Sequence, residues 1–349
     1  MHSRAALLFA FAFAVMADPV SSVAYAIEAA LRALRGDLAL LLPTMGLVVA
    51  IVVLVIVNYH QLVARYPQGG GAAAATGEAF GEGAAFVPIG ALIVDFVLTI
   101  AISSAAGASA IIVPALAPWR IPIALLLVTG VAAGTWFGHV GRAVFAVMTV
   151  AFIASAVMVL GFGFAATPAP TGITSTEPGH PPLVAVALAF PVAMALATGI
   201  EAPSSAIAQL GQLDDPGRRR FGRITLWLTL GVVGTLTLGL TAQAVRLGVG
   251  IPPEDTTQIA ELARIGAPGP VFAIFQLMTA LLLLSAASSF VPGRSRAAQG
   301  AGPSRGSWTA QHRDPAEVAG PYQLPSHALL GRGGVSARLR RGDRRGGWS

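Results

Sequence analysis

Long apolar stretches, separated by short polar segments, dominate the first 290 residues of this chain. A helix that crosses the hydrocarbon core of a bilayer needs about 20 apolar residues in succession. Eight stretches fit this requirement, over residues 5–34, 38–58, 85–113, 121–138, 142–165, 183–209, 222–245 and 268–290. The pattern therefore predicts an all-α integral membrane protein.

Two of these spans carry the same polar interruption, in which an acidic residue is followed by a proline and a pair of serines. One begins at Asp18 and occupies residues 18–22, and the other begins at Glu201 and occupies residues 201–205. An acidic side chain at the centre of a membrane helix costs about 2.5–3.5 kcal/mol, so it is rare without a partner or a function. A bilayer tolerates a proline break only where the helix faces protein or a water-filled cavity. Two broken helices in the two halves of a chain are typical of the substrate site of a secondary transporter.

The span over residues 85–113 carries a polar stripe. Asp95, Thr99 and Ser103 are four residues apart and therefore share one helix face. A hydroxyl bonded to the carbonyl four residues back would explain either hydroxyl alone, but not the carboxylate. No basic residue lies in the interior of the spans to pair with the three acids. We expect these acids to be protonated or to surround a bound cation, states that a proton-coupled cation transporter would use in turn; a purely structural role is the alternative.

Composition supports a membrane protein and narrows its chemistry. Hydrophobic residues make up 55% of the 349 residues and charged residues only 11%, which is too little charge for a soluble domain of this length. There is no cysteine, so disulfides and cysteine-based metal sites are excluded. Residues 1–291 carry 12 arginines against 13 acids, so the net charge of +6 comes from residues 292–349. We therefore expect no nucleic-acid partner, no cofactor and no transition metal.

The arginines near the span ends predict the orientation, because positively charged loops stay in the cytoplasm. With the N-terminus inside, the cytoplasmic loops hold Arg4, Arg65, Arg142 and the cluster over residues 218–223. We expect a multi-pass protein of the cell (plasma) membrane with a cytoplasmic N-terminus. The segment 167–182, rich in Pro, Thr and Gly, is predicted to be a flexible external loop, and the Gly- and Ala-rich segment 66–83 is too weakly apolar to span.

The chain resembles the KimA-type potassium transporters of the amino acid–polyamine–organocation (APC) superfamily. The resembling runs are residues 18–25, 66–72, 94–99 and 198–202, within a match over about residues 10–290. The resemblance implies a LeuT/APC-type inverted-repeat fold, in which helices 1–5 mirror helices 6–10 and the ion lies at the broken parts of helices 1 and 6. It also implies proton-coupled uptake of potassium.

The same resemblance assigns ion binding residue by residue. The matching positions on helices 1, 3 and 6 are Asp18, Tyr25, Asp95, Thr99, Ser103, Thr198 and Glu201. Phe96 departs from the pattern, because the potassium transporters carry a tyrosine there, so one oxygen that would face the ion is missing. Proton coupling falls to Asp18, Asp95 and Glu201, and we expect Glu201 to carry the proton because the helix 6 break can open to either side.

The main alternative is a proton-coupled permease for amino acids or polyamines of the same superfamily. Amino acid permeases hold the substrate carboxylate on bare backbone N–H groups of a Gly-rich break. Here Asp18 would repel an anionic group and Pro19 offers no N–H, so we expect a cation site, with an organic cation left open. An intramembrane aspartyl protease also needs two membrane carboxylates, but its Gly-x-Gly-Asp context is absent, so we expect no enzyme.

The apolar pattern ends abruptly at Val291, and residues 292–349 are rich in Arg, Gly, Pro and Ser. We expect a transmembrane core over residues 1–291, followed by a basic tail that is either disordered or out of frame. The resemblance implies roughly twelve spans, of which about eight are recognised here. An out-of-frame tail would leave the repeat incomplete and the product non-functional. The expected partners are a small cation and the lipid bilayer, and a homodimer is left open.

Overall fold

Helices provide the regular structure of the described part of the chain. The computed structural model describes residues 4–288 apart from 112–118, 137–141, 176–178, 211–212 and 254–255. The basic tail expected over residues 292–349 therefore lies outside the described residues. Within the described ranges, strand-like pairing is limited to two isolated β-bridges, so the expected all-α class is confirmed.

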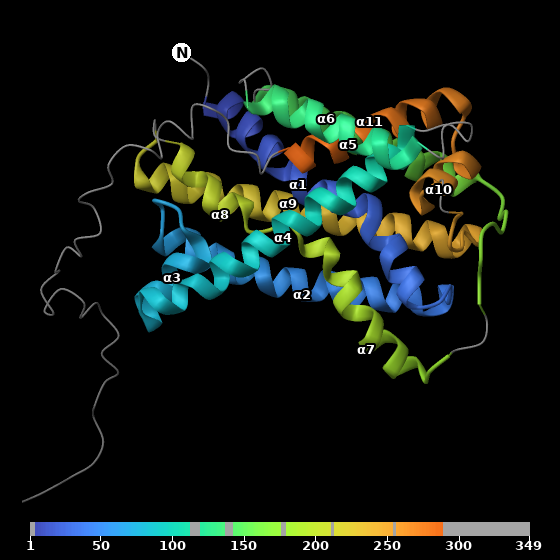
Figure 1. Cartoon of the computed structure of the whole chain (residues 1–349), viewed down its shortest axis with the longest axis horizontal. Coiled ribbons are helices and arrows are strands. Elements are labelled where there is room, and N and C mark those ends of the chain that lie inside the picture. Colours follow the sequence, from blue (N-terminus) through green and yellow to red (C-terminus); the bar gives the residue numbers. More distant parts are fainter. Residues whose placement is uncertain are drawn as a thin grey trace, which may run out of the picture. The chain divides into compact units, whose positions relative to one another are not determined.

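Long helices form the body of the chain and shorter ones connect or interrupt them (Figure 1). The long helices are α1 (Arg4–Ala33), α2 (Leu38–Arg65), α4 (Glu82–Ile111), α5 (Arg120–Trp136), α6 (Arg142–Ala165), α9 (Asp215–Leu247) and α11 (Gly269–Ser288). The shorter helices are α3 (Gly71–Phe80), α7 (Pro182–Ala193), α8 (Ala202–Ala206) and α10 (Gln258–Gly266). Two 3-10 turns, Met194–Ala197 and Ile207–Gln209, follow α7 and α8.

Seven helical segments are long and apolar enough to cross a membrane, and they fall on seven of the eight expected spans. One of these segments, Pro182–Ala206, joins α7, a 3-10 turn and α8. The expected span over 121–138 corresponds to α5, which has 17 residues; its expected end, 137–138, lies outside the described residues. The Gly- and Ala-rich segment forms α3, whose 10 residues are too few to span, as predicted.

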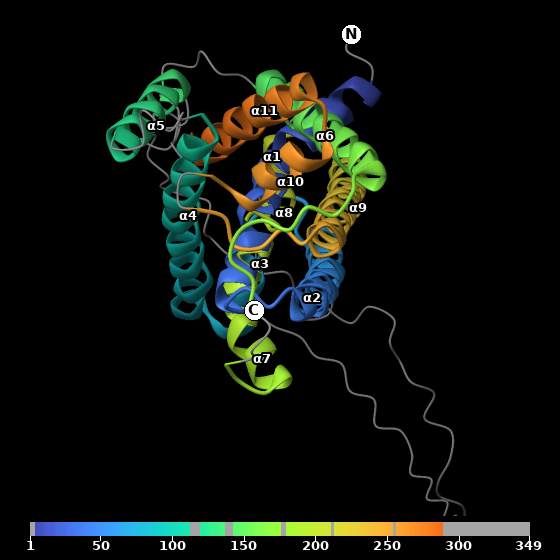
Figure 2. The ribbon, with the colours of Figure 1, turned by 90° about the vertical axis from the view of Figure 1, so that its right-hand side faces the viewer.

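Three spans of the first half contact spans of the second half. α1 packs against α7, the Met194–Ala197 turn and α8, while α2 packs along α9 and α4 along α11. Figure 2 shows α2 beside α9 and α4 beside α11. The first, second and third spans thus contact the sixth, seventh and eighth, which is the order that two halves related by a two-fold axis produce. The packing supports the inverted-repeat fold.

α1 is the most buried of the candidate spans and contacts most of the other helices. Small residues are frequent over its residues 17–30, and they let neighbouring helices approach closely. In Figure 2, α1 runs through the middle of the other helices. Because α1 lies there, the polar residues 18–22 are enclosed by protein instead of facing lipid.

α1 is continuous from Arg4 to Ala33, so the break predicted at Pro19 is absent. Proline removes only one N–H donor, and the turns on either side of it keep the helical geometry. The Ser21 hydroxyl donates to the Asp18 carbonyl at 2.7 Å, which adds a polar contact on the same turn. The first polar run therefore belongs to a regular helix, in contrast to the second.

The segment expected to be a flexible external loop pairs with other parts of the backbone. Ile173 exchanges two hydrogen bonds with Ile251, both at 2.9 Å, and the Ser175 N–H donates to the Gly36 carbonyl at 3.1 Å. Thr171 forms a second isolated bridge nearby. The sequence did not predict this pairing, because extended backbone groups can find partners whatever their side chains are.

Candidate functional site

The sixth span is interrupted where its backbone leaves the helical conformation. α7 ends at Ala193, a 3-10 turn follows, and α8 begins at Ala202. Gly199 has a φ of +76°, a left-handed conformation that costs other residues about 1–2 kcal/mol. Pro203 stands in the first turn of α8, where its missing N–H has no helical partner to lose. The glycine therefore turns the chain within the break, and the proline helps to start the next helix.

The Asp18 side chain of α1 packs directly against the glycine of this break. A Cβ atom at Gly199 would overlap the Asp18 carboxylate, so only glycine leaves room for it. Asp18 is 5% exposed, and within the described part of the chain neither carboxylate oxygen has a hydrogen-bond partner. The ion pairs found among the described residues do not involve Asp18. Because a buried, unpaired carboxylate is costly, this one requires a proton or a cation.

Three hydroxyls join α1 to the break. The Thr198 hydroxyl lies 2.5 Å from that of Ser22 and 3.0 Å from that of Tyr25, and the last two lie 3.0 Å apart. Thr198 donates its one proton to the Ala195 carbonyl at 3.0 Å, so toward α1 it acts as an acceptor. This triangle fixes the break against α1. Tyr25 and Thr198 were expected site residues, whereas Ser22 was not selected as one.

Thr99 and Ser103 of α4 are buried, and their hydroxyls have no hydrogen-bond partner in the described structure. Ser104 and Ser109 of the same helix bond to the carbonyl four residues back, as helical serines commonly do. Unpartnered hydroxyls also occur on α9, so such a group does not mark a site by itself. On α4 these hydroxyls share a helix face with Asp95, and oxygens that can replace water are what a dehydrated alkali cation needs.

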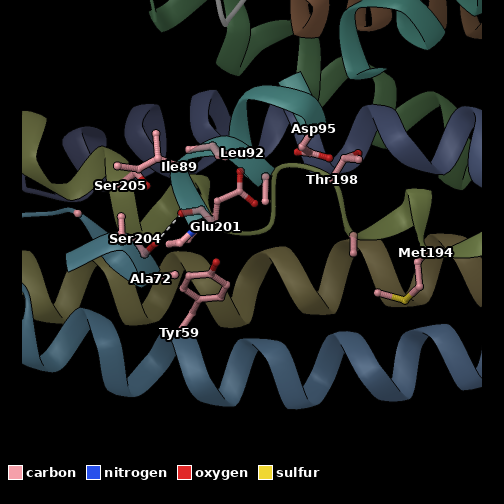
Figure 3. A pocket seen from close by; sticks show the side chains of 15 residues that line it. Tyr59, Ala72, Ile89, Leu92, Asp95, Met194, Thr198, Glu201, Ser204 and Ser205 are labelled. Atoms are coloured by element: carbon pink, nitrogen blue, oxygen red, sulfur yellow. Dashed lines mark hydrogen bonds between the residues drawn. The ribbon is translucent and has the colours of Figure 1, made fainter. Parts of the chain in front are cut away.

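A cavity of about 330 Å³ lies beside the break, between α2, α3, α4 and α8. Its acidic side chains are Asp95 and Glu201, and Tyr59 and Thr198 add hydroxyls. Figure 3 shows the Glu201 carboxylate in the cavity, above the Tyr59 ring, with Asp95 beside Thr198. Asp18 does not line this cavity. Glu201 and Asp95 therefore meet the cavity, while Asp18 is enclosed at the contact of α1 with the break.

The structure distributes the expected site residues over three adjoining places. Asp18, Tyr25 and Thr198 meet at the break, Asp95 and Glu201 line the cavity, and Thr99 and Ser103 are buried on α4. No three His, Cys, Asp or Glu side chains of the described residues have the spacing of a metal site. A cation here would thus meet hydroxyl and carbonyl oxygens together with nearby carboxylates.

Sequence reasoning did not select Tyr59 or Ser204, which the structure brings to the cavity. Tyr59 is close to the end of α2, where an aromatic residue is commonly an interfacial anchor. Its place shortly before the resembling run 66–72 was the available signal. Ser204 belongs to the polar run after Glu201, and its hydroxyl donates to the Glu201 carbonyl at 2.7 Å.

Comparisons with known proteins bear on most of this chain. No family model matches it. The chain is 29% identical over 286 residues to the potassium transporter KimA of Bacillus subtilis (strain 168), a match that covers 78% of this chain. The chain spans 46%, about half, of the length of that relative. With seven candidate spans and this similarity, the chain is a multi-pass membrane protein that is similar to the potassium transporter KimA, as its motifs predicted.

Proposed function

We propose that this chain is a secondary transporter that takes up potassium across the plasma membrane together with protons. The observation that supports this most is the Asp18 carboxylate, which is buried against Gly199 without a hydrogen-bond or ion-pair partner among the described residues. The similarity to a protein named as a potassium transporter supports potassium as the ion.

A cation fits the break better than the carboxylate of an amino acid does. An anionic group at Gly199 would meet the Asp18 carboxylate in a place with little water, where repulsion between like charges is strong. A cation there would neutralise Asp18 and remove the cost of its burial. This argument favours a cation in general, and a polyamine remains one of the outcomes of the experiment below.

Each group has a distinct role in this proposal. Asp18 supplies the negative charge, and the free hydroxyl oxygens of Thr99 and Ser103 replace water around the ion. The hydroxyls of Tyr25 and Thr198 hold the break against α1, so that the ion site keeps its shape. None of these groups needs a cofactor to act.

The coupled proton is assigned to Glu201. Its carboxylate faces the cavity, which gives protons a path to water, and Asp95 lines the same cavity. Two carboxylates in one enclosed space cannot both be charged at low cost unless a cation is present. Binding of the cation would therefore favour release of the proton from Glu201, and release of the proton would favour binding of the cation. This mutual dependence couples transport of the ion to transport of the proton.

The proposed orientation puts the N-terminus in the cytoplasm. Arg65 ends α2, and Arg218, Arg219 and Arg220 lie in the first turns of α9. α3 follows directly after Arg65 and lines the cavity. With these arginines in the cytoplasm, the cavity lies toward that side of the membrane.

Rubidium uptake into proteoliposomes tests the proposed function. The purified chain should take up rubidium when the outside is more acidic, and potassium should compete while amino acids and polyamines should not. Asp18→Asn should abolish this uptake, and Glu82→Gln, which changes an exposed acid at the start of α4, should leave it intact. Uptake of neutral amino acids with no rubidium signal would refute the proposal.

A further inference from the structure

Gln68, Arg218 and Asp215 form a closed polar network at the end of the bundle where α3 and the start of α9 lie (Figure 1). The Gln68 side-chain carbonyl accepts a hydrogen bond from Arg218 at 2.6 Å, and the Gln68 amide group donates to Asp215 at 2.8 Å. Arg218 also lies 3.4 Å from the Asp215 carboxylate and donates to the Leu210 carbonyl at 3.1 Å. Its side chain is only 13% exposed, so it is anchored in the protein instead of extending into solvent.

The three glycines after Gln68, here called the glycine segment (residues 69–71), lie against the second half of the sixth span. A Cβ atom at Gly69 would lie 2.9 Å from the Ala208 side chain, and one at Gly71 would lie 2.8 Å from the Ser204 hydroxyl. All three glycines have a positive φ, from +46° to +94°. Backbone without side chains therefore packs directly on α8 and the turn that follows it.

This contact forms a wall of the cavity beside the break. Gly70, Ala72 and Ala73 line the cavity from the side of α3, and Ser204 lines it from α8. Ser204 is 1% exposed although it lies at this wall, because Gly71 packs against it. Whatever holds the glycine segment in place therefore also keeps Ser204 covered.

We propose that Gln68 and Arg218 are positioning residues that hold the glycine segment against α8 and thereby limit access to the cavity from this end of the bundle. Arg218 is fixed to the Leu210 carbonyl beyond α8, and Gln68 directly precedes the glycines, so the network ties the two sides of the contact together. Glycine has the most conformational freedom to regain, so the segment should move away readily once this tie is lost. The inference rests on the proposed function only for the identity of the solute that uses the cavity.

The absence of cysteine allows a direct test. Ser204→Cys places a single thiol beneath the glycine segment, and its rate of reaction with N-ethylmaleimide in lipid nanodiscs reports how often it is uncovered. Adding Gln68→Ala should raise this rate about tenfold, the effect of losing a hydrogen bond to a charged group. Arg218→Ala should act similarly, and the double variant should add little because both changes remove the same network. Gln61→Ala, which changes an exposed glutamine of α2, is the matched control and should leave the rate unchanged.

A second reporter separates local opening from general unfolding. Ser109→Cys places a thiol at a buried position near the C-terminal end of α4. This thiol should react equally slowly in the parent and in the Gln68, Arg218 and Gln61 variants. An unchanged rate at Ser204→Cys, or an equal rise at both thiols, would overturn the inference. Rubidium uptake, measured with the same variants, keeps the two proposals distinct. If the labelling rates change as expected but neither the parent nor any variant takes up rubidium, the positioning role stands and the proposed function fails.

Discussion

Single residues of the site depend on partners that lie far away in the sequence. Gly199 leaves space that the Asp18 carboxylate fills, and its φ of +76° suits no other residue well. The Asp18 carboxylate has no hydrogen-bond partner among the described residues, so no neighbouring group of the protein stabilises its negative charge. Substitutions at these two positions therefore test different properties: the shape of the break at Gly199 and the charge of the site at Asp18.

Gly199→Ala should destabilise the protein and abolish rubidium uptake. The left-handed backbone alone costs alanine about 1–2 kcal/mol, and the overlap with Asp18 adds to this cost. Thermal unfolding in detergent measures the change. Gly231→Ala is the control: nothing lies within 4 Å of a Cβ atom there, so alanine should stabilise α9 by up to about 1 kcal/mol. Parent-like stability of Gly199→Ala would contradict the packing described for the break.

Asp18→Asn should separate ion binding from folding. Potassium should raise the unfolding temperature of the parent, because a ligand that binds only the folded state stabilises it. The variant should show no such rise, yet without potassium it should be at least as stable as the parent, since a neutral amide needs neither a proton nor a cation to be buried. Glu82→Gln should respond to potassium as the parent does. A potassium-induced rise that persists in Asp18→Asn would remove Asp18 from the ion site.

Glu201→Gln should uncouple the ion from the proton. Glutamine keeps the size of the side chain but cannot take up or release a proton, so uptake driven by an acidic exterior should be lost. Exchange of rubidium for potassium at equal pH should persist in part, because Asp18 and the hydroxyls of α4 are unchanged. Uptake of the variant should therefore no longer respond to pH. A variant with the pH response of the parent would assign the proton to another acid.

Among the elements, α3 is tied to the end of α2 by a polar cluster outside the spans. Glu78 accepts hydrogen bonds from the Arg65 guanidinium and from the Tyr66 hydroxyl. The Arg65 guanidinium, followed by the Tyr66 hydroxyl, holds the pKa of Glu78 below its usual value. This cluster holds the end of α3, and the Gln68–Arg218 network holds its beginning. Because α3 lines the cavity, both contacts also fix a wall of the cavity.

A lowered pKa at Glu78 gives the attachment of α3 a defined pH dependence. The stabilisation is complete above the ordinary glutamate pKa of about 4.3 and is lost as the pH falls through the lower value of the folded state. The protection of the α3 amides against hydrogen exchange, relative to their intrinsic exchange rates at each pH, should therefore fall below about pH 4. The Glu78 side chain is 50% exposed, so the effect should be small. Glu78→Gln should exchange faster already at neutral pH, whereas Glu82→Gln should not; equal rates in both would show that Glu78 does not hold α3.

The elements also show what the sequence could and could not predict. Hydrophobic runs predict spans well, because the bilayer imposes a length that few other structures require. The effect of Pro19 was mispredicted, since a helix packed on many sides keeps its geometry despite one lost hydrogen bond. The pairing of Ile173 with Ile251 and the presence of Tyr59 in the cavity depend on tertiary contacts, which no local pattern encodes.

For the bundle as a whole, the order of the helix contacts carries the most information. α1 meets α7 and α8, α2 meets α9, and α4 meets α11, so these three early spans each contact their counterpart in the later half. The sequence hinted at this order through two similar polar runs, at residues 18–22 and 201–205, although only the second interrupts its helix. The correspondence between the halves therefore concerns which spans are in contact, and it does not require the two polar runs to have the same backbone.

A disulfide between α2 and α9 tests this arrangement directly. A Cβ atom at Gly234 would lie 3.6 Å from Val49 Cγ1, so side chains at these two positions touch and two cysteines there should be able to form a disulfide. In the cysteine-free chain, Val49→Cys with Gly234→Cys should lose its reactivity toward a maleimide polymer after mild oxidation and regain it on reduction. Val49→Cys with Gly231→Cys is the matched control, because Gly231 has no neighbour within 4 Å and its thiol should stay free. Free thiols in the first pair, or equal oxidation of both pairs, would show that α2 and α9 do not pack as described, and the two-fold order of the bundle would fail with them.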